Sequence, residues 1–207
     1  MLENLHLPKE VIQLFQTHGT VLHYKKGDLL QKCDCYNTGV CIIIKGIVKV
    51  SVQSDNKKIF LYHINGKQPN MINYSGIYSK ENSDICCICL DDVTILRMTN
   101  HQFLEWVNAF SEFRALMIAS FHKHYTSILE RTQNTSDQPL KTILYNYLKV
   151  KVDLYNTNEV KVPLLEISED LNFSREAISR GLKTLESENR IIRKTRSIIV
   201  LEQSIAS

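Results

Sequence analysis

Hydrophobic and polar residues alternate over much of the first hundred residues, in short runs separated by turn-forming residues. Such alternation is typical of half-buried antiparallel strands. The runs lie at 41–50, where a glycine divides two apolar segments, and at 59–64, 85–90 and 93–98. A short helix is expected near 9–18. The pattern predicts an N-terminal antiparallel β-roll that covers residues 1–99.

The middle of the chain follows a helical pattern. From residue 100 to about residue 133 there is neither proline nor glycine. An apolar stripe with steps of three, four and three residues suits a helix that packs on a second copy of itself; it consists of Ile118, Phe121, Tyr125 and Ile128. Packing on the β-roll of the same chain is the alternative. The polar segment 134–139 breaks the pattern and predicts a hinge, so 100–136 is expected to form a dimerisation helix with its hinge, and 137–207 a further domain.

Two short amphipathic helices are predicted in that last domain, after a helix at 140–152. The first covers 164–171, with Leu165, Ile167 and Leu171 available for a core. The second starts at Ser174, whose hydroxyl suits an N-cap. Its apolar face consists of Ala177, Ile178, Leu182 and Leu185.

The polar face of the second helix carries side chains that can read DNA. These are Ser174, Arg175, Glu176, Ser179 and Arg180, all within two turns of the helix N-terminus. An arginine can donate two hydrogen bonds to guanine, and a glutamate can accept one from cytosine. Serine hydroxyls suit phosphate oxygens. The alternative is an ordinary solvated helix with scattered charge.

A hairpin is predicted directly after this helix, because two β-branched runs within 190–201 flank a short basic turn. Arg193, Lys194 and Arg196 lie in or beside the turn. Residues 171–200 hold seven basic and three acidic residues, a balance of +4, whereas the whole chain carries +3. Positive charge is therefore concentrated where phosphates would lie. A solvated basic turn is the alternative.

At these residues the chain resembles the Crp/Fnr family of bacterial transcription regulators. The most specific match is the stretch 174–180, and the segments 24–30 and 41–50 resemble the family's first strand with its glycine turn and its strand–Gly–strand hairpin. The resemblance implies an α+β fold with a β-roll sensor, a long dimerisation helix and a winged helix-turn-helix. It also implies that Arg175, Glu176 and Arg180 read bases in each half of a palindromic site, while Ser174 and Ser179 hold the backbone. The implied partners are double-stranded DNA, a second copy of the chain, and RNA polymerase.

The chain departs from the cyclic-nucleotide-binding members of that family. Their phosphate cassette has a Gly-Glu pair and then an Arg-Ser or Arg-Thr pair. The matching stretch here, 65–83, has no Gly-Glu, and Asn82-Ser83 stands about where the second pair would be. An asparagine cannot neutralise a buried phosphate, so we do not expect a cyclic nucleotide as effector. Within this stretch, only Lys67 or Lys80 could supply a positive charge in place of that arginine.

Six cysteines form two groups, both in the predicted β-roll: Cys33, Cys35, Cys41, Cys86, Cys87 and Cys89. Three interpretations stay open, namely small buried apolar residues, redox sensing, and metal or cluster binding. Cys87 and Cys89 would share one face of a strand and are the redox candidates. The family's iron–sulfur members carry N-terminal cysteines that this chain lacks. The family's haem-binding members use histidine or cysteine as axial ligands, and only this analogy makes candidates of His63, His101, His122 and His124. We therefore expect no cofactor and no metal.

Composition limits the remaining classes. A chain of 207 residues with 43% hydrophobic residues suits two small domains with real cores. Neither a signal peptide nor an apolar run of membrane-spanning length is evident, so we expect a cytoplasmic protein with no membrane partner. No enzyme motif appears, so an enzyme is not expected. The alternative to a homodimeric transcription regulator is a redox- or metal-responsive cysteine sensor that acts through protein contacts.

Overall fold

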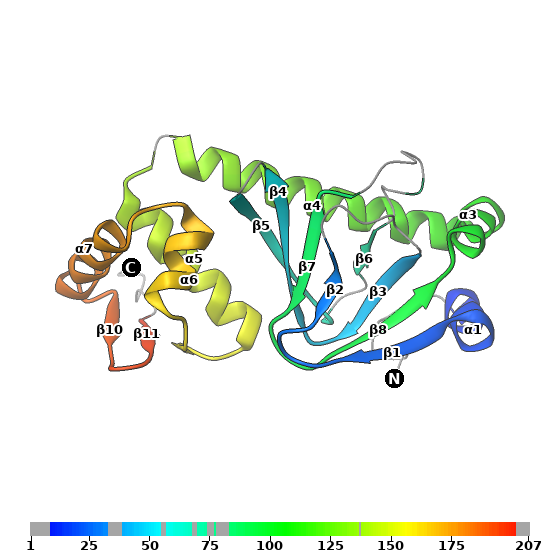
Figure 1. Cartoon of the computed structure of the whole chain (residues 1–207), viewed down its shortest axis with the longest axis horizontal. Helices are drawn as coiled ribbons and strands as arrows, with labels where there is room; N and C mark the ends of the chain where they lie inside the picture. The colour runs from blue at the N-terminus through cyan, green and yellow to red at the C-terminus, as the bar shows by residue number, and fades with distance from the viewer. Residues whose placement is uncertain are drawn as a thin grey trace, which may run out of the picture. The chain divides into compact units, whose positions relative to one another are not determined.

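The computed structural model describes residues 9–32, 39–54, 57–67, 70–73, 77, 83–136 and 138–201, without the side chains of residue 131 and residues 133–136 (Figure 1). The chain forms two compact units, residues 1–129 and 130–207. The sequence predicted a three-part division at residues 99 and 136, with the central helix as a part of its own.

The first unit contains, among its described residues, two antiparallel sheets of four strands each. One has the order β1-β8-β3-β6 and the other β2-β7-β4-β5. The strands are β1 (Thr20–Tyr24), β2 (Leu29–Gln31), β3 (Val40–Lys45), β4 (Ile47–Ser54), β5 (Lys57–Asn65), β6 (Asn70–Ile72), β7 (Ile85–Cys89) and β8 (Val93–Met98). Helix α1 (Lys9–His18) precedes them, as expected.

Both faces of β3 are buried, which explains its nearly continuous apolar sequence. Cys41 and Ile43 belong to the core between the two sheets. Ile42 and Ile44 belong to a second core, which the sheet shares with the helices of this unit. The mixed α+β fold class is confirmed at this level.

The predicted hairpin at 41–50 is wrong in its pairing. β3 pairs with β6 and β8, whereas β4 pairs with β5 and β7, so the two strands lie in different sheets. Gly46 carries the chain between them with φ of 91°. A Cβ there would lie 2.5 Å from the Asp92 carbonyl oxygen, so the crossing requires glycine.

The predicted continuous helix from residue 100 is interrupted at Phe110. Helix α3 (Asn100–Ala109) begins with a capping box between Thr99 and Gln102. Phe110 is extended, and α4 (Ser111–Ser136) follows. Arg114 donates to the Val107 carbonyl oxygen at 3.0 Å and so ties the two helices together. The break lets aromatic residues of both helices enter the same core. The sequence did not indicate it, because no proline or glycine lies at this position.

Helix α4 uses two different faces. Phe113, Ser120 and His124 are buried in the first unit. Ser120 accepts a hydrogen bond from the Met71 amide at 3.2 Å, and the His124 ring stacks on Tyr62 with centroids 4.8 Å apart. The predicted dimer stripe lies elsewhere on the helix: Ile118, Phe121, Tyr125 and Ile128 are all exposed.

The second unit is built from α5 (Leu140–Tyr155), β9 (Glu159–Val160), α6 (Leu164–Leu171), α7 (Arg175–Ser187), β10 (Ile191–Arg193) and β11 (Ile198–Val200). Its core joins all three helices to the hairpin. The predicted bounds of α6 are confirmed, and so is the hairpin. Leu165 was expected in this core but is 44% exposed, while Ile167 and Leu171 are buried.

Candidate nucleic-acid interface

Helices α6 and α7 are joined by a tight turn of three residues. Asn172 ends α6 in the left-handed conformation, with φ of 57°, which asparagine tolerates better than most residues. The Ser168 hydroxyl donates to the Phe173 carbonyl oxygen at 2.6 Å and fixes the turn. Ser174 then caps α7 as predicted, because its hydroxyl accepts from the Ala177 amide at 3.2 Å.

One side of α7 is committed to the core of the unit. Ile178, Leu182 and Leu185 are buried there. Gly181 is buried as well, and a Cβ at this position would lie 3.1 Å from Leu144 of α5. The glycine therefore allows α7 to lie close to α5, although glycine in a helix interior is intrinsically unfavourable by about 1 kcal/mol. This packing fixes which side of α7 faces outward.

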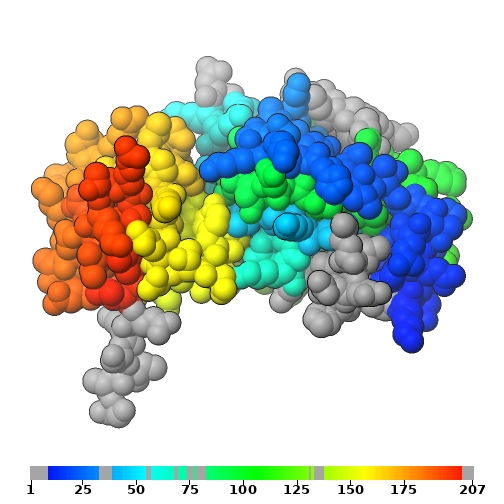
Figure 2. Space-filling model, turned by 90° about the horizontal axis from the view of Figure 1, so that it is seen from below, coloured from blue at the N-terminus to red at the C-terminus, as the bar shows by residue number. Residues whose placement is uncertain are grey.

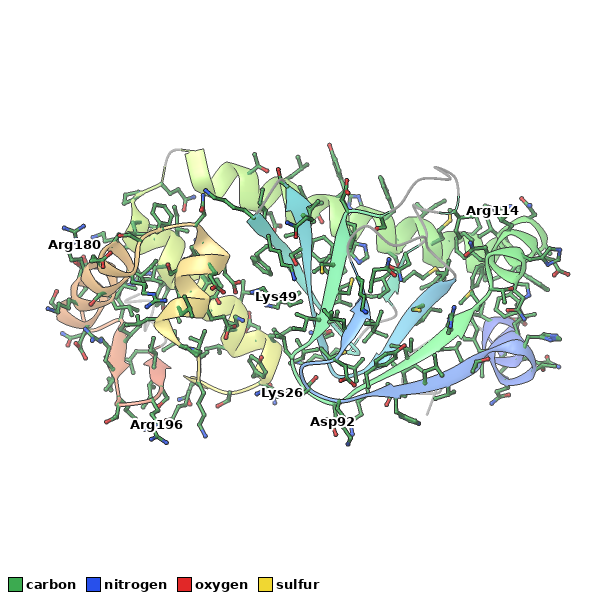
Figure 3. All side chains as sticks on the ribbon, in the orientation of Figure 1. Lys26, Lys49, Asp92, Arg114, Arg180 and Arg196 are labelled. Atoms are coloured by element: carbon green, nitrogen blue, oxygen red, sulfur yellow. The ribbon has the colours of Figure 1, made fainter. Side chains whose placement is uncertain are left out.

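The outward side of α7 carries the predicted base-reading residues. Arg175, Glu176 and Arg180 are exposed, and Ser179 is half-buried. Arg180 points away from the body of the unit (Figure 3). The pKa of Glu176 lies below its ordinary value, because its carboxylate accepts from its own backbone amide and from Ser174, with nearby Arg175 and Arg180 contributing. Glu176 is thus held ionised at the helix N-terminus.

The hairpin lies beside α7 on the surface of the second unit (Figures 1 and 2). β10 pairs with β11, and β11 pairs in turn with the short strand β9. A hydrogen bond of 2.8 Å from the Lys194 amide to the Ser197 carbonyl oxygen closes the turn. Arg196 extends from this turn (Figure 3).

Two of the three predicted basic residues of the hairpin face carboxylates of the same unit. The Lys194 ammonium lies 3.3 Å from Glu159 Oε1. The Arg193 amide donates to Glu186 Oε1 at 3.0 Å, and its guanidinium lies 4.0 Å from Glu186 Oε2. Within the described residues, Arg196 forms no ion pair. Sequence reasoning missed Glu159, because it lies 35 residues before Lys194 and reaches it only through the pairing of β9 with β11.

A buried polar network anchors α6 to α5. The Lys151 ammonium is 1% exposed and lies 2.8 Å from Glu166 and 3.9 Å from Asp170. The Tyr147 hydroxyl donates to Asp170 at 2.7 Å, and burial together with that carboxylate raises the pKa of Tyr147. No sequence pattern indicated this network, which sets the position of the first helix of the pair.

The redox candidates Cys87 and Cys89 share one face of β7, as predicted, and both are buried between the sheets. Burial raises the pKa of Cys89 to about 11 and that of Cys41 to about 12. A thiol with so high a pKa is a poor nucleophile at neutral pH. Cys33 and Cys35 lie outside the described residues. No cluster of three or more potential metal-binding side chains occurs in the described part of the chain.

Most of the stretch compared with the phosphate cassette, including Lys80 and Asn82, lies outside the described residues, whereas Lys67 and Ser83 lie inside. Of the four histidines considered as haem ligands, His124 is buried, His63 is half-buried, and His101 and His122 are exposed. In the described ranges, no helix is both long and apolar enough to cross a membrane.

Comparison with known proteins gives a clear result for the fold alone. No protein-family model matches the sequence, and no curated protein does. Several solved structures match almost end to end at low identity. A protein assigned to the Crp/Fnr family of transcriptional regulators, from Eubacterium rectale ATCC 33656, has a TM-score of 0.77 at 17% identity, with 98% of this chain and 94% of that chain covered.

The c-di-GMP-responsive global regulator CLP of Xanthomonas campestris has a TM-score of 0.82 at 10% identity, with 95% of this chain and 100% of that chain covered. A Crp/Fnr-family regulator from Thermus thermophilus has a TM-score of 0.72 at 14% identity, with 88% and 94% covered. The chain therefore has the fold of Crp/Fnr-family transcriptional regulators. The resemblance inferred from the sequence is confirmed at the level of the fold.

Proposed function

We propose that this protein is a homodimeric, sequence-specific DNA-binding transcription regulator of the Crp/Fnr type, with a winged helix-turn-helix formed by α6, α7 and the β10–β11 hairpin. The observation that carries the proposal is the outward side of α7. A capped helix presents Arg175, Glu176 and Arg180 near its N-terminus, while its other side is buried. That end of a recognition helix reaches base edges in the major groove.

The chemistry of each side chain determines which part of the DNA it would contact. Arg175 and Arg180 can each donate two hydrogen bonds to a guanine, and the ionised Glu176 can accept from a cytosine amino group. Ser174 and Ser179 suit phosphate oxygens. In the wing, Arg196 is the main candidate for a phosphate contact, with Arg193 and Lys194 beside it.

A twofold protein would match a palindromic site. The exposed stripe on α4 supplies an apolar surface for a second copy, while another face of the same helix serves its own unit. Within the stripe, the Phe121 and Tyr125 rings stack with an interplanar angle of 8°. A dimer would provide two α7 helices, one for each half-site, and half-sites of helix-turn-helix dimers lie about one turn of DNA apart.

The test is selection of bound duplexes from a random pool, run with reduced and with oxidised protein. A palindrome with half-sites one turn apart is expected. On that site, Arg175→Ala should cost about 1–3 kcal/mol and relax the preference at one base pair. Arg196→Ala should weaken binding to all sequences about equally.

Wild-type affinity and preference in both variants would contradict the docking proposed here. A selected site that changes with the redox state would favour a thiol-based sensor, a role to which the buried Cys87 and Cys89 lend no support. A cyclic nucleotide is not part of the proposal, and contact with RNA polymerase stays a prediction.

A further inference from the structure

The β10–β11 hairpin, called the wing below, has an acidic neighbour, Glu159, that the sequence did not indicate. Glu159 lies on β9, opposite Ile199 of β11. One of its oxygens, Oε1, accepts a hydrogen bond of 2.6 Å from the Ser197 hydroxyl and lies 3.3 Å from the Lys194 ammonium. A single carboxylate thus contacts both ends of the 194–197 turn.

We propose that Glu159 is a specificity-determining residue, which holds Lys194 away from DNA phosphates and so limits sequence-independent binding. This inference rests on the proposed DNA-binding function. In this proposal, an acidic side chain outside the recognition helix lowers the affinity of the wing for DNA of any sequence.

The geometry favours Glu159 over the other acidic neighbour of the wing. Glu186 contacts Arg193 mainly through the backbone amide, and its distance to the guanidinium is 4.0 Å. Glu159 contacts the ammonium of Lys194 directly, and the Ser197 hydroxyl fixes the carboxylate in that position. The lysine side chain therefore lies back toward β9. Arg196, on the same turn, has no such partner within the described residues.

The electrostatic consequence is a wing with fewer cations available than its sequence suggests. A phosphate that approaches Lys194 must displace a carboxylate that remains nearby and repels it. Each phosphate that a protein neutralises adds about −0.9 to the slope of log affinity against log salt on duplex DNA. Removal of the charge of Glu159 should therefore add about one phosphate contact.

The test uses Glu159→Gln in the full-length protein. The amide oxygen of glutamine can still accept from Ser197, so the wing keeps its shape and only the charge is lost. Binding to a short duplex of scrambled sequence is measured by fluorescence anisotropy between about 50 and 200 mM salt. Over that range the affinity of the variant should fall about 3.5-fold more than that of the wild type, and binding at the low-salt end should be several-fold tighter.

Glu188→Gln is the matched control. It changes the net charge by the same amount, but Glu188 pairs with Lys141 of α5 rather than with the wing. In a double-mutant cycle, Lys194→Gln should abolish the gain of Glu159→Gln. Thermal unfolding of each variant verifies that the fold persists.

The outcomes separate the two proposals. If the wild type has no salt-dependent affinity for any duplex, the DNA-binding function itself is refuted. If the wild type binds DNA but Glu159→Gln leaves affinity and salt slope unchanged, lowers the affinity, or behaves like Glu188→Gln, only the role given to Glu159 is wrong.

Discussion

The exposed stripe on α4 allows the proposed dimer to be tested with one substitution, Phe121→Ala. Phe121 is 57% exposed in the single chain. A phenylalanine buries about 200 Å² when fully covered, so about 115 Å² is left for a partner. At about 25 cal/mol per Å², that area is worth about 3 kcal/mol in each protomer.

Two symmetry-related copies would double this value, but buried area converts only partly into affinity, because association also costs translational, rotational and side-chain entropy. We therefore expect Phe121→Ala to weaken the dimer by about 2.5 kcal/mol, which is roughly a 70-fold increase in the dissociation constant. Sedimentation velocity over a concentration series measures that constant directly.

Val150→Ala provides the matched control. Val150 is 54% exposed but lies on α5, outside the stripe, so its truncation should leave the dissociation constant unchanged. A wild type that stays monomeric at high micromolar concentration, or a Phe121→Ala variant that associates like the wild type, would refute the assignment of this face to a second copy.

Two further predictions concern stability. Burial, with a contribution from Lys123, lowers the pKa of His124 to about 4. The imidazole therefore takes up a proton below about pH 6.5 in the unfolded chain but stays neutral in the folded one. As a result, the free energy of unfolding decreases as pH falls from 6.5 toward 4, by about 2 kcal/mol at pH 5. Denaturant unfolding at pH 8 and pH 5 should show that His124→Gln removes this component, whereas the exposed His122→Gln retains it; equal pH dependence in all three proteins would contradict the burial argument. Lys151→Met leaves two carboxylates of α6 without their buried cation and should cost about 3–5 kcal/mol, while the exposed Lys149→Met should be near neutral by the same measurement.

The elements with a strong periodic pattern were predicted well. Helix α7 was located from its N-cap and apolar spacing, and α6 and β8 have the bounds that the pattern indicated. An N-cap and an apolar spacing involve only residues that are close in sequence, so they can be recognised without knowledge of the tertiary structure. The outward side of α7 followed in part from the same periodicity, because burial of Ile178 and Leu182 leaves Glu176 and Arg180 on the opposite side of the helix. Arg175 lies on the same side as Leu182 and is exposed because it is the first residue of the helix.

Features that depend on partners far along the chain were not predictable in this way. β6 and β9 are three and two residues long, too short for any periodicity, and are defined only by the strands beside them. Gly46 looked like the centre of a hairpin, since a strand–Gly–strand sequence is the same whether the two strands pair or enter different sheets. The counter-ion Glu159 was missed for a related reason, because a charge count along 171–200 includes only residues that are close in sequence.

The stripe on α4 posed a choice between two partners, and the structure shows why sequence alone left it open. Ile118, Phe121 and Tyr125 could equally have packed on the β-roll of their own chain. The β-roll is instead contacted by a different face, through Ser120 and His124, which lies roughly a third of a turn around the helix. The alternative of a helix that packs only on its own unit would leave Phe121 and Tyr125 without a role, since their rings stack on each other in solvent. A second copy of the same helix would cover them, and a twofold dimer would provide two α7 helices, one for each half of a palindromic site.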